Sequence, residues 1–299
     1  MKVSLRKKIA FVSCNKAHAL SSLVGNSDAL TGKFFLSDAS KVEVLEHELE
    51  NFQPDLVIVF EPENFTQFVR VFSRYSTVGY FLDPLPFDGN YGDTRLNQNF
   101  GKLEKFSSEI STTYKYLIAR NSNFSRAYES LFNIWQYRSL PVNDSLFRPG
   151  LESSLSNYNQ ALFAGEVNDY TKKYIEEVNK KQPVISSLDI GSHQIESNHF
   201  QIGLNLHSSK FPDFEQEALI HMANGRLLLS QSLSPKLNFK NGFSHLEFDS
   251  PTDLLGLIGD IAGYPESYEA IRRYGFHATS RYKASKLWSD FMLDIELSG

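Results

Sequence analysis

The sequence has little that points to an extracellular or membrane-spanning protein. Its one cysteine, Cys14, excludes an intrachain disulfide framework and a cysteine-rich zinc site. Its densest apolar runs, at residues 56–60 and 226–230, are far shorter than the roughly 18 residues that a membrane helix needs. We therefore expect a soluble, cytoplasmic protein without a transmembrane segment, and peripheral association with a membrane stays open.

The start of the chain lacks a complete secretion signal. Residues 1–8 are basic, as at the beginning of a signal peptide, but the apolar run 9–14 is stopped by Asn15 and Lys16. That run is shorter than the apolar core of about 7–15 residues that a signal peptide requires, and no small-residue cleavage site follows it. We interpret residues 9–14 as the first buried strand.

The sequence also lacks an excess of positive charge and the common cofactor-binding motifs. The net charge of −5 argues against a protein that coats nucleic acid, because such binding needs many clustered Lys and Arg. The chain has no Walker loop, GxGxxG fingerprint, nucleophile elbow, zincin motif or Asp-x-Asp pair. No His, Cys and Asp spacing indicates a metal site. We expect no cofactor, and a local basic pocket for a phosphate remains possible.

Short apolar runs alternate with helical patterns along most of the chain. This alternation is typical of βα units on parallel sheets whose strands are buried on both faces. A helix over residues 40–52, which ends before Pro54, shows the pattern most clearly. The predicted fold class is α/β, with Rossmann-like doubly wound sheets. The predicted strands are residues 8–14, 33–36, 55–60, 77–82, 116–119, 161–164, 184–188, 203–206 and 227–230; the other predicted helices are 169–181, 215–223, 252–261 and 267–278.

Length and composition predict two domains that face each other across a cleft. With 299 residues, the chain is about twice the length of a typical domain. The polar stretch 149–159 has no clear period and is the candidate linker. We expect one domain over residues 1–150, a second over 156–275, and a helix over 276–299. Trp288, Phe291, Met292 and Ile295 give that helix an apolar stripe that would pack back on the first domain.

Polar residues that directly follow the apolar runs are the candidate site residues, because open α/β sheets bind ligands at the carboxyl ends of their strands. His18 follows the first strand, where it would act as a general base, bind an anion or remain a solvated loop histidine. Asp83 lies between a strand and two prolines, in a rigid position that suits either a base or a turn. The others are Asn15, Lys16, Glu61, Glu63, Gly165, Glu166, His207, Ser208 and Ser209.

Residues 203–282 resemble the C-terminal domain of glycosyltransferases with the GT-B fold. The stretches that carry the resemblance are GLNLHSS (203–209), FEQEALIHMANG (214–225), RLLLS (226–230), FKNGF (239–243) and HLEFD (245–249), continued by residues 253–255, 272–275 and 281–282. They look closest to the CgeB-like group, which is of the spore maturation protein type. In the first half, residues 53–59, 79–84 and 140–149 fit the same group, so the resemblance covers most of the chain.

The resemblance implies a donor site on the second domain. The N-terminus of the helix at 215–223 offers unpaired N–H groups and a positive dipole end to a diphosphate. Lys210 and Arg226 would add positive charge, and a Glu on this helix would bind the ribose hydroxyls. The donor-side residues it implies are Gly165, Glu166, His207, Ser208, Lys210, Glu215, Glu217, Gly225 and Arg226, with Asp83 or His18 approaching from the first domain.

The chain departs from the related family-4-type pattern at one position. Alignment of Phe214 and Gly225 with that pattern puts Ile220 where the ribose-binding Glu stands. Glu217, one turn earlier on the same face, is the candidate replacement. In the family-4-type pattern, a second carboxylate stands earlier in the chain and forms a pair with this Glu. If Glu217 is the later member of the pair, the earlier one would stand where this chain has Ser209, so the retaining mechanism does not follow from the resemblance. Acid enrichment in a first helical turn is the alternative explanation of Glu215 and Glu217.

The first hypothesis is a metal-independent glycosyltransferase. It would take a UDP, GDP or dTDP sugar as donor and transfer the sugar to a glycan, lipid-linked or protein acceptor, with undetermined stereochemistry. The second is a non-catalytic sugar-binding or nucleotide-binding regulatory protein of the same fold, which the missing Glu at Ile220 favours. A sugar epimerase of this fold and a secreted two-lobed receptor are further alternatives.

Overall fold

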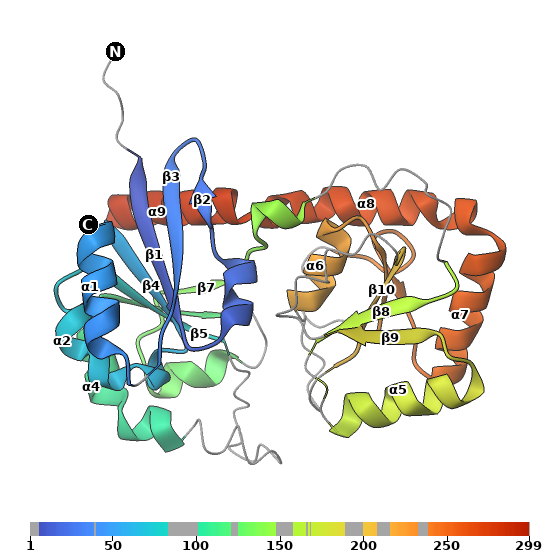
Figure 1. Cartoon of the computed structure of the whole chain (residues 1–299), viewed down its shortest axis with the longest axis horizontal. Helices are drawn as coiled ribbons and strands as arrows, with labels where there is room; N and C mark the ends of the chain where they lie inside the picture. The colour runs from blue at the N-terminus through green and yellow to red at the C-terminus, as the bar shows by residue number, and fades with distance from the viewer. Residues whose placement is uncertain are drawn as a thin grey trace. The chain divides into compact units, whose positions relative to one another are not determined.

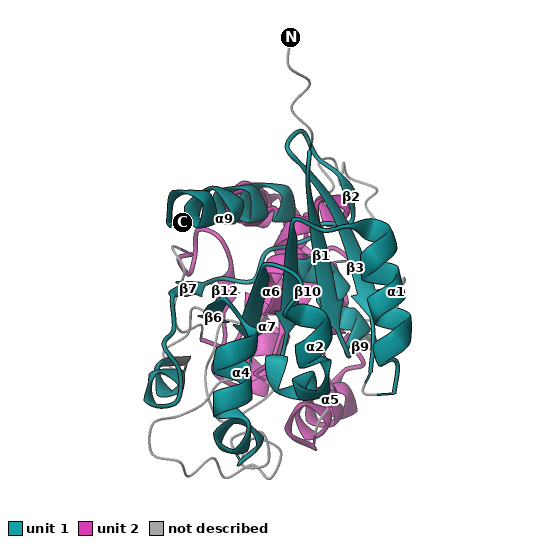
Figure 2. Ribbon diagram, turned by 90° about the vertical axis from the view of Figure 1, so that its left-hand side faces the viewer, with its two compact units in different colours: residues 1–143, 284–299 teal, residues 144–283 magenta. Residues whose placement is uncertain are grey.

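A computed structural model gives the architecture of the chain (Figure 1). It divides into two compact units, which Figure 2 shows in different colours: residues 1–143 with 284–299 form unit 1, and residues 144–283 form unit 2. Among the described residues, no helix has the length and apolar character to cross a membrane. The structure describes residues 6–38, 40–82, 101–120, 125–147, 158–165, 167, 169–188, 200–207, 216–232 and 239–298.

Unit 1 is built on a seven-stranded sheet in which one edge strand is antiparallel and every other neighbouring pair is parallel. The strand β4 is buried at all five positions, as expected for a strand covered on both faces. The order across the sheet is β2 (Gly25–Asn26), β3 (Leu30–Leu36), β1 (Lys7–Ser13), β4 (Leu56–Phe60), β5 (Thr77–Phe81), β6 (Tyr116–Arg120) and β7 (Gln136–Arg138).

The helices of unit 1 follow from short amphipathic patterns. In α1, Leu45 and Leu49 are one turn apart and are both buried. The helix ends at Gln53, which adopts a left-handed conformation with φ 53° and donates its N–H to the Leu49 carbonyl. The helices are α1 (Val42–Phe52), α2 (Val69–Phe72), α4 (Ser107–Thr113) and α9 (Ala284–Ser298), with short 3₁₀ helices η1 (Lys16–Ser21), η2 (Pro62–Asn64), η3 (Thr66–Phe68) and η4 (Ser125–Ser130).

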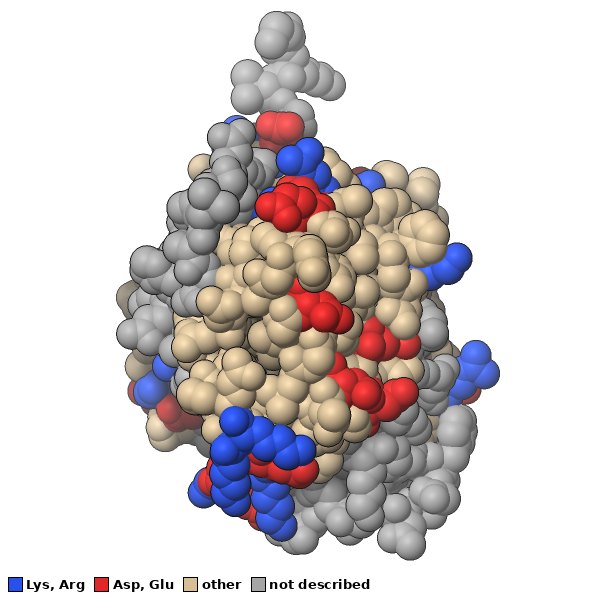
Figure 3. All heavy atoms as spheres, turned by 90° about the vertical axis from the view of Figure 1, so that its right-hand side faces the viewer, with Lys and Arg blue, Asp and Glu red and all other residues tan. Residues whose placement is uncertain are grey.

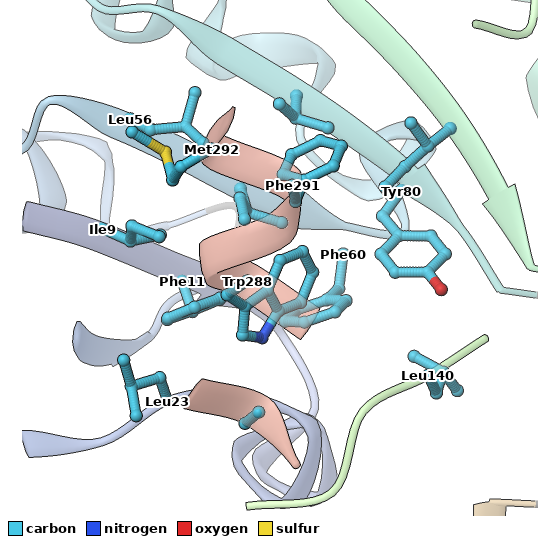
Figure 4. Close-up of a cluster of buried hydrophobic side chains, with 14 of the residues drawn as sticks. Ile9, Phe11, Leu23, Leu56, Phe60, Tyr80, Leu140, Trp288, Phe291 and Met292 are labelled. Atoms are coloured by element: carbon cyan, nitrogen blue, oxygen red, sulfur yellow. The ribbon is translucent and has the colours of Figure 1, made fainter. Parts of the chain in front are cut away.

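The last helix, α9, packs on the sheet of unit 1, which confirms the predicted return of the C-terminal helix. Figure 4 shows Trp288, Phe291 and Met292 of this helix among side chains of the central strands. The ring of Trp288 lies 5.2 Å from that of Phe11, and its Nε1 donates to the Ser21 carbonyl at 3.0 Å. The indole therefore fills the core and also satisfies its one polar atom.

The boundaries of the two units differ from the predicted ones in position. Asn143 still belongs to unit 1, because its N–H donates to the Leu20 carbonyl at 2.7 Å. Phe147 already lies in unit 2, where its ring stacks edge-on with that of Phe276 at 6.4 Å. Residues 276–283 also belong to unit 2, and the helix that joins unit 1 begins at Ala284 rather than 276. The predicted linker lies mostly outside the described residues.

Unit 2 has a five-stranded sheet in which all neighbouring strands are parallel, and side chains of this sheet form part of a second hydrophobic core. The order across it is β12 (Leu246–Glu247), β11 (Leu227–Ser230), β10 (Ile202–Asn205), β8 (Ala161–Ala164) and β9 (Ile185–Leu188). Its helices are α5 (Asp169–Lys181), α6 (Gln216–Ala223), α7 (Pro251–Gly263) and α8 (Glu269–Thr279), with short 3₁₀ helices η5 (Asp144–Leu146), η7 (Pro265–Tyr268) and η8 (Ser280–Tyr282). Both units thus have the expected Rossmann-like, parallel α/β form.

Helix α6 approaches the sheet of unit 2 unusually closely at Gly203. A Cβ atom on Gly203 would lie 2.3 Å from Cγ of His221 and 2.5 Å from its Cβ. His221 is fully buried on α6, and burial, together with the charge of Arg226, lowers the pKa of its imidazole well below the usual range. The neutral imidazole is therefore a core side chain that fits only against a glycine.

Trp288→Ala tests how much α9 contributes to unit 1. We expect a loss of about 3–5 kcal/mol in the free energy of unfolding, because the change leaves a large cavity in the core. Leu293→Ala, on the exposed side of the same helix, is the matched control and should change stability by less than about 0.5 kcal/mol. Trp135, the only other tryptophan, also lies in unit 1, so fluorescence in a urea titration follows this unit. Equal stabilities of the two variants would contradict the packing described.

Gly203→Ala tests the contact between α6 and β10. The added methyl group must push α6 off the sheet, and we expect a destabilisation of about 1–3 kcal/mol, measured by circular dichroism during denaturation. Gly256→Ala is the control: it lies inside α7 with nothing within 4 Å of the added Cβ. That control should stabilise unit 2 by up to about 1 kcal/mol, because alanine favours a helix. A Gly203→Ala variant as stable as the wild type would disprove the close contact.

Candidate functional site

Each unit has one sheet edge at which a ligand crevice is expected. In open α/β sheets, ligands bind at the carboxyl ends of the strands, where the strand order reverses. In unit 1 the order reverses between β1 and β4, and in unit 2 it reverses between β8 and β10. The carboxyl edge of each sheet is described separately below.

At the carboxyl edge of unit 1, three polar side chains that follow β1 and β4 in the sequence contact one another. The Cys14 thiol donates to Oε2 of Glu61 at 3.6 Å, and the Asn64 amide donates to the same oxygen at 3.4 Å. Glu61 has a left-handed backbone with φ 54°, and its N–H donates to the Tyr80 carbonyl at 2.9 Å. A non-glycine residue in this region stores strain, and such residues concentrate at functional sites.

Burial and the charge of Glu61 together keep the Cys14 thiol protonated. Burial, and next the Glu61 carboxylate, raise the pKa of the Cys14 thiol to about 11. Glu63, which is also buried, adds a smaller effect in the same direction. Cys14 is therefore a protonated hydrogen-bond donor to Glu61 at neutral pH, which is unfavourable for a nucleophilic thiolate.

His18 lies in η1, the short helix that follows β1. Its Nδ1 is 2.7 Å from Oγ of Ser13, and its ring packs on Phe60 with the centroids 5.2 Å apart. Burial lowers the pKa of His18 to about 4, so the imidazole is neutral at pH 7. A neutral imidazole can accept a proton, whereas an imidazolium cannot. The structure thus places His18 and Glu61 at the ends of the two strands that flank the reversal point.

At the carboxyl edge of unit 2, His207 is tied to the end of β11. Its backbone N–H donates to Oε1 of Gln231 at 2.9 Å, and its Nε2 lies 2.8 Å from the Ser232 carbonyl oxygen. The Gln231 amide donates onward to the Tyr170 hydroxyl at 2.7 Å. These contacts join the ends of β10 and β11 with the start of α5. Beneath them, the Asn205 amide donates to the buried Ser230 hydroxyl at 2.9 Å.

Helix α6 begins at this same edge, and Glu217 lies in its first turn. The Glu217 side chain is half-buried, whereas Ile220 is completely buried in the core. A carboxylate at Ile220 would therefore be enclosed in apolar surroundings, so the usual family-4-type position is occupied by a core residue. Gly165 follows β8 at the same edge and is buried, and a Cβ on it would lie 3.0 Å from the Phe163 ring.

Gly225 and Arg226 lie at the other end of α6, away from this edge. The helix runs antiparallel to the strands, and its eight residues span about 12 Å. Gly225 has a positive φ of 72° at the turn into β11, and its carbonyl accepts from Arg272 at 2.8 Å. Arg226 is 2% exposed and donates to the Phe200 carbonyl at 3.2 Å. The structure therefore does not bring these two residues together with His207 and Glu217.

Of the remaining candidates, Asn15 caps η1 by accepting from the Ala17 N–H, Lys16 begins that helix, and the others are outside the part of the chain that the structure describes. Within the described ranges, no group of three or more His, Cys, Asp or Glu is arranged to hold a metal ion. On the face drawn in Figure 3, the described Lys and Arg side chains form small groups beside Asp and Glu rather than one continuous basic surface. The candidates outside the described residues are Asp83, Glu166, Ser208, Ser209, Lys210 and Glu215.

Several residues of the two edges were not predicted. Ser13 and Cys14 were assigned to the strand itself, and Asn64 and Gln231 were not singled out. Each lies at a strand end or within four residues after it, so a signal was present in their position. What the sequence lacks is the pairing of the strands: only the register of β1 with β4 shows that Cys14 and Glu61 are neighbours.

Comparison with known proteins identifies the fold but no family. No protein-family model matches the sequence, and no curated protein matches it. Solved structures match both units along almost the whole chain. HepE from Anabaena, solved with UDP-glucose, superimposes with a TM-score of 0.59 at 11% identity, over 97% of this chain and 99% of that one.

Two further structures show the same likeness. Sucrose-phosphate synthase from Thermosynechococcus elongatus has a TM-score of 0.58 at 10% identity, over 98% of this chain and 100% of that one. A glycosyltransferase from Rickettsia africae has a TM-score of 0.57 at 9% identity, over 96% and 97%. At these identities the likeness establishes the fold, which is the two-domain GT-B fold predicted from the sequence.

The depressed pKa of His18 predicts an acid-sensitive unit 1. Between the unfolded value of 6.5 and the folded value of about 4, the unfolded chain binds a proton that the folded unit does not. Stability is therefore retained above pH 6.5 and falls as the pH decreases, by about 2 kcal/mol from His18 at pH 5.

The measurement compares His18→Gln with the wild type by tryptophan fluorescence in urea at pH 7 and pH 5. The variant should lose about 2 kcal/mol less than the wild type over this interval. His47→Gln, at an exposed position of α1, should follow the wild type. Identical losses in wild type and His18→Gln would show that His18 titrates normally in the folded unit.

Proposed function

We propose that the protein is a glycosyltransferase that transfers a sugar from a nucleotide diphosphate donor. The observation that supports it most is the likeness of the whole chain, at the level of fold, to HepE structures that contain UDP or UDP-glucose and to sucrose-phosphate synthase. Placement within the CgeB-like group is part of the proposal and rests on the sequence stretches between residues 203 and 282.

The donor is assigned to the carboxyl edge of unit 2. The N-terminus of α6 provides N–H groups and a positive dipole end for the diphosphate. Glu217, half-buried in the first turn, is assigned to a hydroxyl pair of the nucleoside, since Ile220 is closed off in the core. Lys210 is proposed to stabilise the leaving diphosphate, and Glu166, Ser208 and Glu215 are further proposed donor-side residues. Arg226, held at the opposite end of α6, is no longer part of this assignment.

The acceptor is assigned to the carboxyl edge of unit 1. During transfer, the acceptor hydroxyl forms a bond with the anomeric carbon and gives up its proton, while the nucleoside diphosphate leaves. Glu61, His18 and Asp83 are the groups proposed to bind or deprotonate that hydroxyl. A carboxylate that accepts hydrogen bonds from Cys14 and Asn64 is a suitable acceptor of a further one from a substrate hydroxyl. Transfer without a metal is also proposed, because the sequence has no Asp-x-Asp pair.

The second candidate is a binding protein of the same fold that does not turn over its ligand. The fully buried Ile220, at the position of a ribose-binding Glu in related enzymes, favours it. The two candidates differ in one measurable respect, since only the first consumes a nucleotide sugar.

The test is calorimetric titration with UDP, GDP and dTDP, followed by product analysis with the sugar form of the nucleotide that binds. A transferase releases free nucleoside diphosphate, and EDTA should leave that rate unchanged. Glu61→Gln should lower turnover by about 100-fold or more with little change in nucleotide affinity, as expected for a group that acts on a proton. Glu217→Gln should instead weaken nucleotide binding by about tenfold, the effect of one charged hydrogen bond.

Two exposed glutamates supply the controls: Glu43→Gln on α1 for unit 1 and Glu176→Gln on α5 for unit 2 should behave as the wild type. Absence of binding to all three nucleotides would refute the proposed function. Binding without any turnover would favour the second candidate.

A further inference from the structure

One ring nitrogen of His207 has a hydrogen-bond partner among the described residues, and the other has none there. Its Nε2 lies 2.8 Å from the Ser232 carbonyl oxygen. A carbonyl oxygen carries no proton, so this bond forms only if Nε2 carries the hydrogen and donates it. In the neutral imidazole, Nδ1 then carries a lone pair and can only accept a hydrogen bond.

No described residue donates a hydrogen bond to this Nδ1, which is buried. A buried acceptor without a donor is costly, and native proteins contain few of them. The bond from Nε2 to the Ser232 carbonyl holds the ring in this orientation, and the backbone of His207 is held as well. The backbone N–H of His207 is held by Gln231, whose amide is held in turn by Tyr170. The ring is thus held with an acceptor to which no residue of the described ranges donates.

The surroundings point to a ligand rather than to the core. His207 follows β10, one of the two strands between which the order of the sheet reverses. The side chain as a whole is half-buried at this edge and not enclosed, unlike the completely buried His221 of α6. A ligand at the carboxyl edge therefore lies within reach of the His207 ring.

We infer that Nδ1 of His207 accepts a hydrogen bond from a hydroxyl group of the donor substrate, so that His207 recognises its sugar and not its diphosphate. The inference rests on the proposed function. A phosphate oxygen carries no hydrogen at neutral pH and would face the lone pair of Nδ1 without a bond, whereas every ribose and hexose hydroxyl can donate. His207 is then a specificity residue, and Gln231 is the positioning residue that fixes its backbone.

His207→Gln is the variant that isolates Nδ1. The glutamine amide nitrogen can replace Nε2 as the donor to the Ser232 carbonyl, but the glutamine carbonyl oxygen, its one acceptor, then does not lie at the position of Nδ1. The control is His277→Gln, an exposed histidine on α8. Thermal unfolding first checks that each variant is folded.

The probes are UDP, 2′,3′-dideoxy-UDP and UDP-glucose, or the matching guanosine compounds if the wild type prefers GDP. A loss of about tenfold or more for UDP-glucose alone identifies a hexose hydroxyl as the partner. A similar loss for UDP and UDP-glucose, but none for the dideoxy compound, identifies a ribose hydroxyl. Equal losses for all three would assign His207 to the diphosphate and overturn the inference, and so would unchanged affinities.

A second measurement does not depend on any variant. Two-bond ¹H–¹⁵N NMR spectra of the imidazoles report which ring nitrogen carries the hydrogen. We expect the Nε2–H form of His207 in the free protein, and a shift of the unprotonated Nδ1 when UDP-glucose binds. A doubly protonated ring in the complex would overturn the inference. If the wild type binds none of the nucleotides, the proposed function itself fails, which is a different result from binding that His207→Gln leaves intact.

Discussion

Parallel pairing of strands that are buried on both faces is the constraint on which the rest of this structure depends. A strand such as β4, with all five residues buried, has no room for polar side chains except at its ends. Parallel register then aligns the ends of neighbouring strands, so β1 and β4 bring Cys14 and Glu61 to one place. The polar chemistry of both units is concentrated at the strand ends because the apolar strands exclude it elsewhere.

The fold was predictable from the sequence because hydrophobic periodicity is a local property. The strands of four or more residues, α1 and the apolar stripe of α9 were recognised from runs of a few residues, and Trp288 and Phe291 pack as that stripe indicates. The shorter strands β2, β7 and β12 were not predicted. The unit boundary at Asn143 was not, because it is fixed by a hydrogen bond to Leu20, more than a hundred residues away. The sequence contains no local sign of such a bond.

The candidate site was predictable only as a set of strand ends. His18, His207 and Glu217 lie at the carboxyl edges because they directly follow strands or begin a helix there. Arg226 shows where this reasoning fails: it is close in sequence to Glu217, but a helix separates the two, and the arginine is buried at the far end. Distance along the sequence does not reveal at which edge of a sheet a residue lies.

Two histidines of unit 2, the buried His221 and the half-buried His207, show how packing divides chemical roles between similar side chains. His221 fills the space above Gly203, and the absence of a Cβ there lets α6 lie directly on β10. That contact positions the N-terminus of α6 relative to the carboxyl ends of the strands, where residues that follow β11 hold His207. His221 is neutral and enclosed in the core, so it takes no part in chemistry. Its contribution is to position α6 at the edge of the sheet where Nδ1 of His207 is available as an acceptor for a ligand.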